Sequence, residues 1–176
     1  MKANPDPRVA SNWSIMPKDY TLYGIRFVNE FHGRYLMRGG STVKLTSTGA
    51  LVQTQVYRKK YVESDEVVIV KTSGKNKIIY GNSLRLSPTS PGKFEMQITV
   101  DDNGNCTIAQ TAASAYPITG TGKYVKGIEE WGGNKQQAFY LNYQITQGAN
   151  THQVNDTLVF RDKNVKFEEF TMVVLP

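Results

Sequence analysis

Hydrophobic and polar residues alternate with a period of two along much of this chain. In KFEMQITV, residues 93–100, every second side chain is apolar, which is the pattern of a strand with one buried and one solvated face. The segment runs into DDNGN, whose Asn103-Gly104 pair is typical of a tight hairpin turn, and CTIAQT follows. We therefore predict a β-hairpin over residues 93–111.

The same pattern recurs from end to end. It predicts eight to ten strands at spacings of 8 to 14 residues, and no window has the sustained 3.6-residue period of an amphipathic helix. A turn is expected around Gly39-Gly40. Twelve strand-like segments are the candidates for these eight to ten strands: 25–31, 33–39, 41–47, 50–62, 66–72, 77–86, 93–100, 106–111, 120–127, 138–146, 151–161 and 167–174.

The fold class that follows is all-β. Short, hairpin-like connections favour an antiparallel up-and-down barrel, lipocalin-like, in which closure removes both sheet edges. Residues 86–93 and 110–122 could instead be crossovers of a β-sandwich, which is the alternative. Residues 1–20 are Pro-rich and unpatterned, and we interpret them as a linker or N-terminal strap. Residues 21–176 are predicted to form the single barrel domain.

Composition narrows the classes of partner. The 176 residues suit one domain, and the net charge is +6. Nucleic acid is not an expected partner, because the longest basic run, 58–60, is followed closely by the acidic residues of 63–66. Cys106 is the only cysteine, which excludes an internal disulfide and a thiolate metal cluster. Its strand-like setting predicts a small buried residue.

Candidate catalytic groups are sparse. His32 and His152 are isolated, without the spacing of metal ligands, and we interpret them as partly exposed strand or turn residues. Glu129 and Glu130 are adjacent and point to opposite faces of an extended chain, so they cannot act as an acid and base pair. No nucleophile elbow or phosphate-binding loop is present in the sequence. We predict no enzymatic activity and no cofactor.

VDDNGNC, residues 100–106, brings together oxygen-bearing side chains of the kind that bind calcium. The spacing of Asp101, Asp102 and Asn103 does not match the calcium loop motif, and no glutamate follows at the required distance. We predict that the domain binds no structural metal and that a chelator leaves its melting temperature unchanged.

Aromatic residues offer more evidence of a binding site than the candidate catalytic or metal-binding groups do. In AFYLNYQIT, Tyr140, Asn142 and Gln144 share one face, and this mixture of a ring with amides suits sugars, whose C–H faces stack on rings while their hydroxyls pair with amides. Trp131 lies between an acidic pair and two glycines, in a turn. It either contacts a ligand or caps the barrel mouth. The candidate binding residues are Trp131, Tyr140, Asn142 and Gln144.

The last third of the chain carries a family resemblance. GTGKYVKGIEEWGGNKQQAFYLNYQIT and HQVNDTLVFRDKNVKFEEFTMVV resemble the C-terminal β-domain of Bacteroidetes surface lipoproteins from polysaccharide-utilisation loci. In those proteins this uncharacterised domain, lipocalin-like in appearance, follows a glycoside-hydrolase-associated N-terminal domain. NWSIMPKDYTLYG resembles the junction between the two. The family has no defined catalytic motif, so the resemblance assigns no catalytic residue.

The resemblance implies a cell-surface location, on the outer membrane or on its periplasmic side. It also implies an upstream lipid anchor absent from this chain and an outer-membrane glycan-uptake complex as partner. Together with the aromatic positions, it leads to the hypothesis of a non-catalytic domain that assists polysaccharide or oligosaccharide binding. The alternative is a structural spacer or docking domain with no ligand of its own.

Overall fold

The computed structural model describes residues 3–6, 8–15, 27–84 and 92–164. The chain divides into two compact units, and the unit Val28–Val165 holds the nine strands. Described residues of the other unit include a 3₁₀ turn, η1 (Ala10–Asn12). There the indole N–H of Trp13 donates to the backbone oxygen of Asp6 at 2.9 Å. No helix among the described residues is long and apolar enough to cross a membrane.

Nine strands and one further 3₁₀ turn, η2 (Val62–Ser64), follow one another in the main unit. The strands are β1 (Gly33–Leu45), β2 (Leu51–Val56), β3 (Glu66–Thr72), β4 (Lys77–Ser83), β5 (Lys93–Val100), β6 (Asn105–Gln110), β7 (Ile118–Trp131), β8 (Asn134–Gln147) and β9 (Asn150–Asp162).

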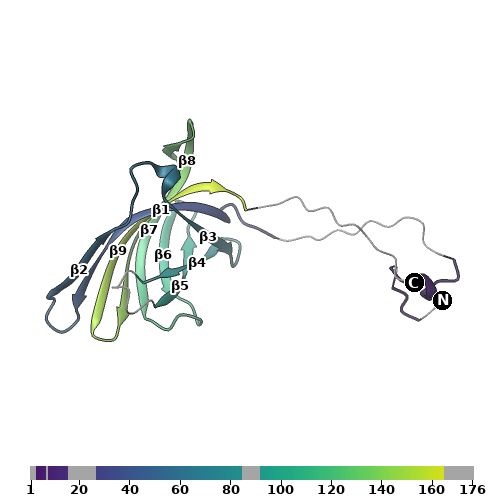
Figure 1. The fold of residues 1–176 in the computed structure, drawn as a ribbon, viewed down its shortest axis with the longest axis horizontal. Coiled ribbons are helices and arrows are strands. Elements are labelled where there is room, and N and C mark those ends of the chain that lie inside the picture. Colours follow the sequence, from purple (N-terminus) through teal and green to yellow (C-terminus); the bar gives the residue numbers. More distant parts are fainter. Residues whose placement is uncertain (1–2, 7, 16–26, 85–91, 165–176) are drawn as a thin grey trace. The chain divides into compact units, whose positions relative to one another are not determined.

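Eight of these strands close into an antiparallel barrel, which confirms the predicted fold class (Figure 1). Strands β3 to β9 pair in chain order, and β1 closes the ring by pairing with both β3 and β9. β1 is long enough to pair with β3 through its first half and with β2 through its second half. β2 therefore lies outside the closed ring, paired with β1 alone among the described strands.

The turns explain where the chain reverses. The predicted β5–β6 hairpin is present, and Gly104 adopts a positive φ of 80° that L-residues rarely tolerate. At the β7–β8 hairpin, Gly132 and Gly133 have φ values of 60° and 73°, as a two-residue hairpin turn of the primed type requires. Trp131 is consequently the last residue of β7, paired with Asn134, and the prediction that it lies in a turn was wrong by one position.

The predicted turn at Gly39-Gly40 was also wrong, because β1 passes straight through both residues while pairing with β9. Gly39 is required there for packing: a Cβ at this position would clash with the backbone oxygen of Asn155 and lie 2.8 Å from Oδ1 of Asp156. The predicted strand 25–31 is not formed over its described residues, 27–31. The predicted strand 167–174 lies outside the described residues.

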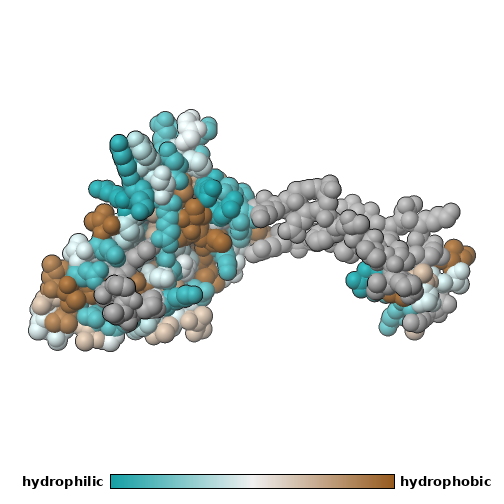
Figure 2. All heavy atoms as spheres, viewed as in Figure 1, coloured by the Kyte–Doolittle hydropathy of each residue, from teal (hydrophilic) through white to brown (hydrophobic). Residues whose placement is uncertain are grey.

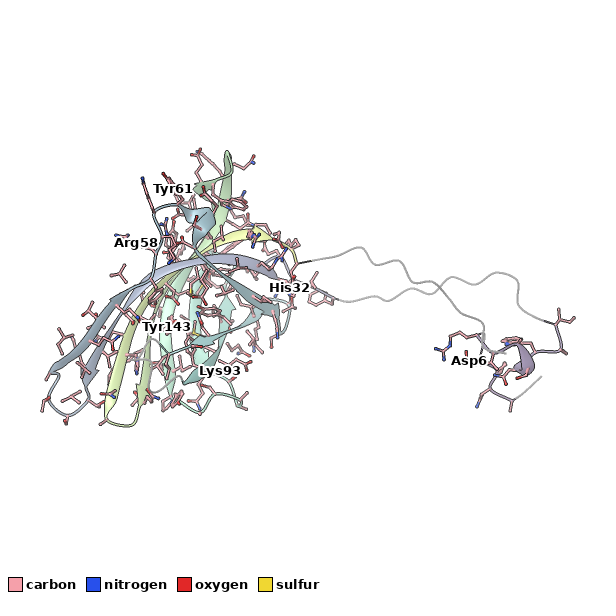
Figure 3. The ribbon with its side chains drawn as sticks, in the orientation of Figure 1. Asp6, His32, Arg58, Tyr61, Lys93 and Tyr143 are labelled. Carbon is pink, nitrogen blue, oxygen red and sulfur yellow. The ribbon has the colours of Figure 1, made fainter. Side chains whose placement is uncertain are left out.

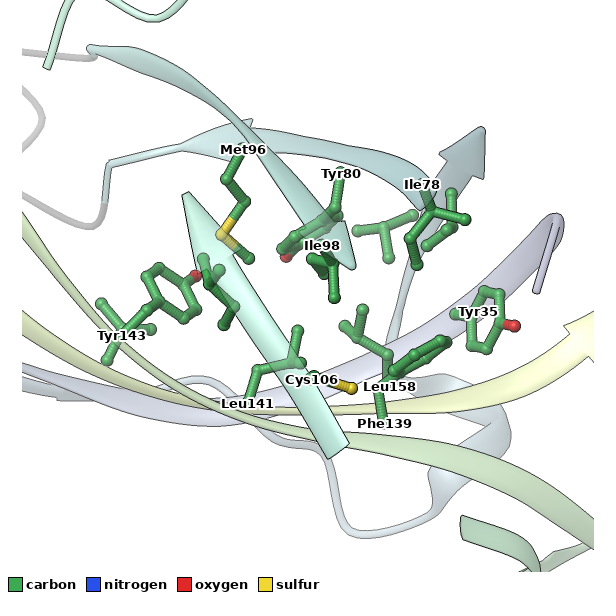
Figure 4. Close-up of a cluster of buried hydrophobic side chains, with 14 of the residues drawn as sticks. Tyr35, Ile78, Tyr80, Met96, Ile98, Cys106, Phe139, Leu141, Tyr143 and Leu158 are labelled. Atoms are coloured by element: carbon green, nitrogen blue, oxygen red, sulfur yellow. The ribbon is translucent and has the colours of Figure 1, made fainter. Parts of the chain in front are cut away.

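The barrel interior is filled by large side chains (Figure 4). Aromatic rings meet edge-on within it, as Phe31 and Tyr124 do with centroids 4.9 Å apart. Eight-stranded barrels have an interior that side chains can just fill. Fully buried members include Tyr35, Tyr80, Phe139, Ile78, Met96, Ile98, Leu141, Ile145 and Leu158. Cys106 belongs to the same core, as predicted, and burial raises the pKa of its thiol to about 12.

The outer surface is mixed. Figure 2 shows apolar side chains gathered toward the far end of the β1–β2 hairpin, where Leu51 and Val52 are exposed. Further apolar side chains are visible among hydrophilic ones toward the middle of the barrel in this view.

Candidate binding site

The interior offers no room for a glycan or a lipocalin-type ligand among the described residues. One small void has a volume of about 10 Å³ and is lined by residues that include Tyr57, Asn82, His152 and Asp156. A void of that size holds one water molecule at most. Larger hollows among the described residues open to solvent. One of about 500 Å³ is lined by residues that include Phe31, Val100 and Tyr124 of the core and Asp101 of the β5–β6 turn, and others lie on the outer face of the sheet.

The polar end of the interior is organised by Asp156, which is 3% exposed. Its Oδ1 accepts a hydrogen bond from the Tyr57 hydroxyl at 2.5 Å. Its Oδ2 accepts from Tyr143 at 2.7 Å and from Tyr80 at 3.3 Å, and Figure 4 shows the hydroxyl ends of Tyr80 and Tyr143 pointing toward each other. Burial first, and the Asp156 charge second, raise the pKa of both tyrosines well above the ordinary value. Both phenols therefore stay protonated, and the Tyr80 hydroxyl also has the sulfur of Met37 as an acceptor at 3.0 Å.

Both histidines are buried rather than partly exposed, which corrects the prediction. His32 is 4% exposed, and its Nδ1 accepts a hydrogen bond from the backbone N–H of Thr72 at 3.2 Å. His152 is 1% exposed and points inward from β9, and its Nε2 has no hydrogen-bond partner among the described groups. Burial lowers the pKa of His152. An alternating pattern cannot distinguish an inward from an outward histidine unless the register is known.

Trp131 and Tyr140 lie together on the outside of the barrel. Both pack against a small outer cluster formed by Leu36, Ala138 and Val159. The Trp131 indole N–H donates to the backbone oxygen of Phe160 at 2.9 Å. Trp131 thus covers apolar side chains and fastens the end of β7 to β9. A ligand contact at Trp131 stays a prediction.

Tyr140 uses its hydroxyl within the protein. It donates to Oε1 of Glu129 at 2.7 Å, and burial together with this carboxylate raises the pKa of Tyr140 to about 12. The ring remains partly exposed on the outward side of β8. What it can still offer a ligand is the face of an aromatic ring beside Asn142.

Asn142 and Gln144 are exposed and face outward from β8, as their alternation with buried residues predicted. Strand register sets each beside a matching amide on β9, since Asn142 pairs with Asn155 and Gln144 with Gln153. On the other side, Thr121 and Thr119 of β7 complete the two rows. Two parallel rows of hydroxyl, amide and amide groups therefore cross three adjacent strands.

These six side chains line a shallow groove, which we call the amide–hydroxyl groove (Thr119, Thr121, Asn142, Gln144, Gln153 and Asn155). All six are exposed. None of them forms a side-chain hydrogen bond with another group in the part of the chain that the structure describes. Amides both donate and accept, and threonine hydroxyls do the same. The groove is an uncharged array of groups available for hydrogen bonding.

Sequence reasoning found two of the six. Thr121 belongs to the predicted strand 120–127, Thr119 directly precedes it, and Gln153 and Asn155 alternate in THQVNDT without any distinguishing motif. Their common face is visible in the alternation, but only the register of β7, β8 and β9 shows that they lie side by side.

No group of three or more His, Cys, Asp or Glu side chains in the described ranges is placed to hold a metal ion. The Asp101 carboxylate is engaged in its own turn. Oδ1 accepts from the backbone N–H groups of Asn103 at 2.9 Å and Asn105 at 2.7 Å, and Oδ2 accepts from the Asn105 side chain at 2.8 Å. These hydrogen bonds lower the pKa of Asp101.

Residues 30–164 match the family model described as a domain of unknown function, DUF5627. The chain belongs to the DUF5627 family. A solved structure from Bacteroides ovatus, a protein of unknown function determined at 2.40 Å resolution, is similar to this DUF5627 chain with a TM-score of 0.79 and 28% sequence identity.

That similarity covers 94% of this chain and 52% of the Bacteroides ovatus chain. The DUF5627 chain thus spans about half the length of the structure it matches. No curated protein matches it.

Proposed function

We propose that this DUF5627 barrel is a non-catalytic glycan-binding domain and that the glycan lies along the amide–hydroxyl groove. The observation that carries the proposal is the gathering, on adjacent strands, of six exposed hydroxyl and amide side chains that have no side-chain hydrogen bond to another described residue. A sugar chain presents many neutral hydroxyls, each of which donates and accepts, and such a set of protein groups is complementary to it.

Tyr140 supports the same assignment. Its ring lies next to Asn142 on the outward side of β8 and remains partly exposed. Aromatic rings bury apolar area at low cost in side-chain entropy, so the C–H face of a sugar can pack on the ring while its hydroxyls reach the groove. The filled interior supports an outer site over an internal one.

The cellular role follows as part of the proposal. The domain assists polysaccharide or oligosaccharide capture as part of a surface lipoprotein, beside an outer-membrane uptake complex. The similar Bacteroides ovatus chain is about twice as long, which agrees with a domain that works beside another.

The test is binding to a panel of plant, host and microbial polysaccharides by affinity electrophoresis, followed by calorimetry on any hit. Asn142→Ala and Gln144→Ala should each weaken binding by about tenfold through loss of side-chain hydrogen bonds. Gln110→Ala is the matched control, because Gln110 is an exposed amide on β6 outside the groove. Binding that survives both groove substitutions would refute this site.

A structural spacer is the second candidate. The observation that favours it is the interior packed with large side chains, which leaves the barrel rigid and without an internal site. Absence of binding to every member of the glycan panel would select the spacer.

A further inference from the structure

A second hollow adjoins the amide–hydroxyl groove. We call it the basic hollow, and its lining includes Arg38, Gly40, Arg58, Glu129, Asn155 and Thr157. Asn155 lines both depressions, so the two are continuous across β9. A chain lying in the groove reaches the hollow without leaving the surface of the barrel.

The floor of the hollow is open because of one glycine. Gly40 occupies the outward position of β1 in register with Asn155 on one side and with Val56 on the other. A longer side chain at this position would cover the surface between β9 and β2. Its absence exposes that surface to a ligand group.

The charged side chains of the hollow differ in how they are engaged. Arg38 is paired with the buried Asp65 carboxylate, with 3.0 Å between Nε and Oδ2. Glu129 accepts a hydrogen bond from the Tyr140 hydroxyl. Arg58 is exposed and makes no hydrogen bond or ion pair with a described residue, and Figure 3 shows it on the outside of the barrel. Its guanidinium is available to a ligand.

The segment that carries Arg58 adds further positive charge and is held in place. Lys59 and Lys60 follow directly and are exposed, so two further cations follow Arg58 along the chain beside the hollow. Oδ1 of Asp65 accepts a hydrogen bond from the backbone N–H of Lys59 at 2.6 Å. This bond fixes the chain next to Arg58, which reduces the entropy that the arginine would lose when it binds.

We propose that the basic hollow binds an anionic substituent, a carboxylate or a sulfate, of the glycan that lies in the groove. The ligand is then an acidic polysaccharide rather than a neutral one. Arg58 supplies the planar pair of N–H donors that fits either anion, and the Thr157 hydroxyl and the Asn155 amide are placed to donate beside it. This inference rests on the proposed function and adds the class of glycan.

The experiment compares matched polymers that differ in charge alone. Polygalacturonate is compared with its methyl ester, and a sulfated galactan with the same galactan after desulfation, by affinity electrophoresis and calorimetry at low and high salt. We expect the charged member of at least one pair to bind about tenfold more tightly, and added salt to reduce the difference. The pair whose two members bind with different affinity shows whether the hollow recognises a carboxylate or a sulfate.

Two variants distinguish binding in the basic hollow from a general effect of the protein's net charge. Arg58→Gln should reduce binding of the charged polymer to the level of its neutral partner and leave the neutral polymer unaffected. Lys71→Gln removes the same charge from an exposed position of β3. It should change the binding of neither the charged nor the neutral polymer. Equal binding of both members of each pair, or equal effects of the two variants, would overturn the inference while the proposed function stands. No binding to any polymer would reject both.

Discussion

At the scale of single residues, the barrel depends on a buried carboxylate as well as on apolar packing. Asp156 accepts hydrogen bonds from Tyr57, Tyr80 and Tyr143, and Gly39 leaves the space that its side chain occupies. A buried charge is tolerated only when its hydrogen-bonding capacity is met. The three phenols meet it here, although the Tyr80 hydroxyl also lies 3.0 Å from the sulfur of Met37 as a second acceptor.

Replacement of Asp156 by alanine should therefore remove the acceptor of the Tyr143 hydroxyl and one acceptor each of the Tyr57 and Tyr80 hydroxyls, and Tyr80 keeps the sulfur of Met37 at 3.0 Å. We expect the free energy of unfolding to fall by about 3 kcal/mol or more, since each buried unsatisfied donor costs about 1–3 kcal/mol. Urea denaturation measures the change. The neighbouring Asn155→Ala is the control, because this exposed side chain should alter stability by less than about 0.5 kcal/mol. Similar unfolding midpoints for the two variants would contradict the role given to Asp156.

His152 gives stability a pH dependence. Burial lowers its pKa below the ordinary value of 6.5, so the folded chain keeps it uncharged while the unfolded chain takes up a proton. The contribution of uncharged His152 to the free energy of unfolding is therefore complete above pH 6.5 and is lost as the pH falls below that value. His152→Gln should flatten the decline in unfolding free energy between pH 7 and 5. Unchanged slopes in wild type and variant, measured by urea titrations, would show that His152 is not responsible.

At the scale of elements, the β7–β8 hairpin extends past the barrel wall and is fastened by Trp131. The register of β7 shifts between Val125 and Glu129, and Gly127 has a φ of 65° in that interval. Beyond the shift, the strand end is held by the Trp131 hydrogen bond to Phe160 and by the outer cluster.

Trp131→Ala should consequently lower the free energy of unfolding by about 2 kcal/mol through lost packing and one lost hydrogen bond. Trp131→Phe retains much of the packing and should cost about half as much. Thermal unfolding followed by circular dichroism measures both. A variant that loses glycan binding at an unchanged melting temperature would instead make Trp131 a ligand contact.

At the scale of the whole molecule, the sequence predicted the class of fold and the buried and exposed faces of β5 and β8 correctly, because alternation directly records which side is buried. It misplaced His152 of β9, which is buried. It did not predict that β1 runs through Gly39-Gly40. Two adjacent glycines are a turn signal unless a partner side chain, here Asp156 from a strand more than a hundred residues away, needs the space. Of the binding groove, it predicted Asn142 and Gln144, whereas their neighbours depend on register between strands that no local pattern encodes.

The same architecture predicts that backbone amides are protected from hydrogen exchange to different degrees in different strands. β8 pairs on both edges and carries buried side chains, whereas β2 pairs on one edge and has exposed Leu51, Val52 and Val56. Amides of β2 should exchange with solvent orders of magnitude faster than those of β8. Hydrogen exchange followed by mass spectrometry measures this. Equal protection of the two strands would indicate that β2 acquires a second partner in solution.

The division of each strand into an inward and an outward set has a consequence for evolution. Inward residues of β8, such as Leu141 and Tyr143, are constrained by the packed interior, while Asn142 and Gln144 between them face solvent. Substitutions at exposed positions change stability little. Descendants of one barrel can therefore vary the outward residues of β7, β8 and β9 and acquire different ligands, without passing through sequences that fail to fold.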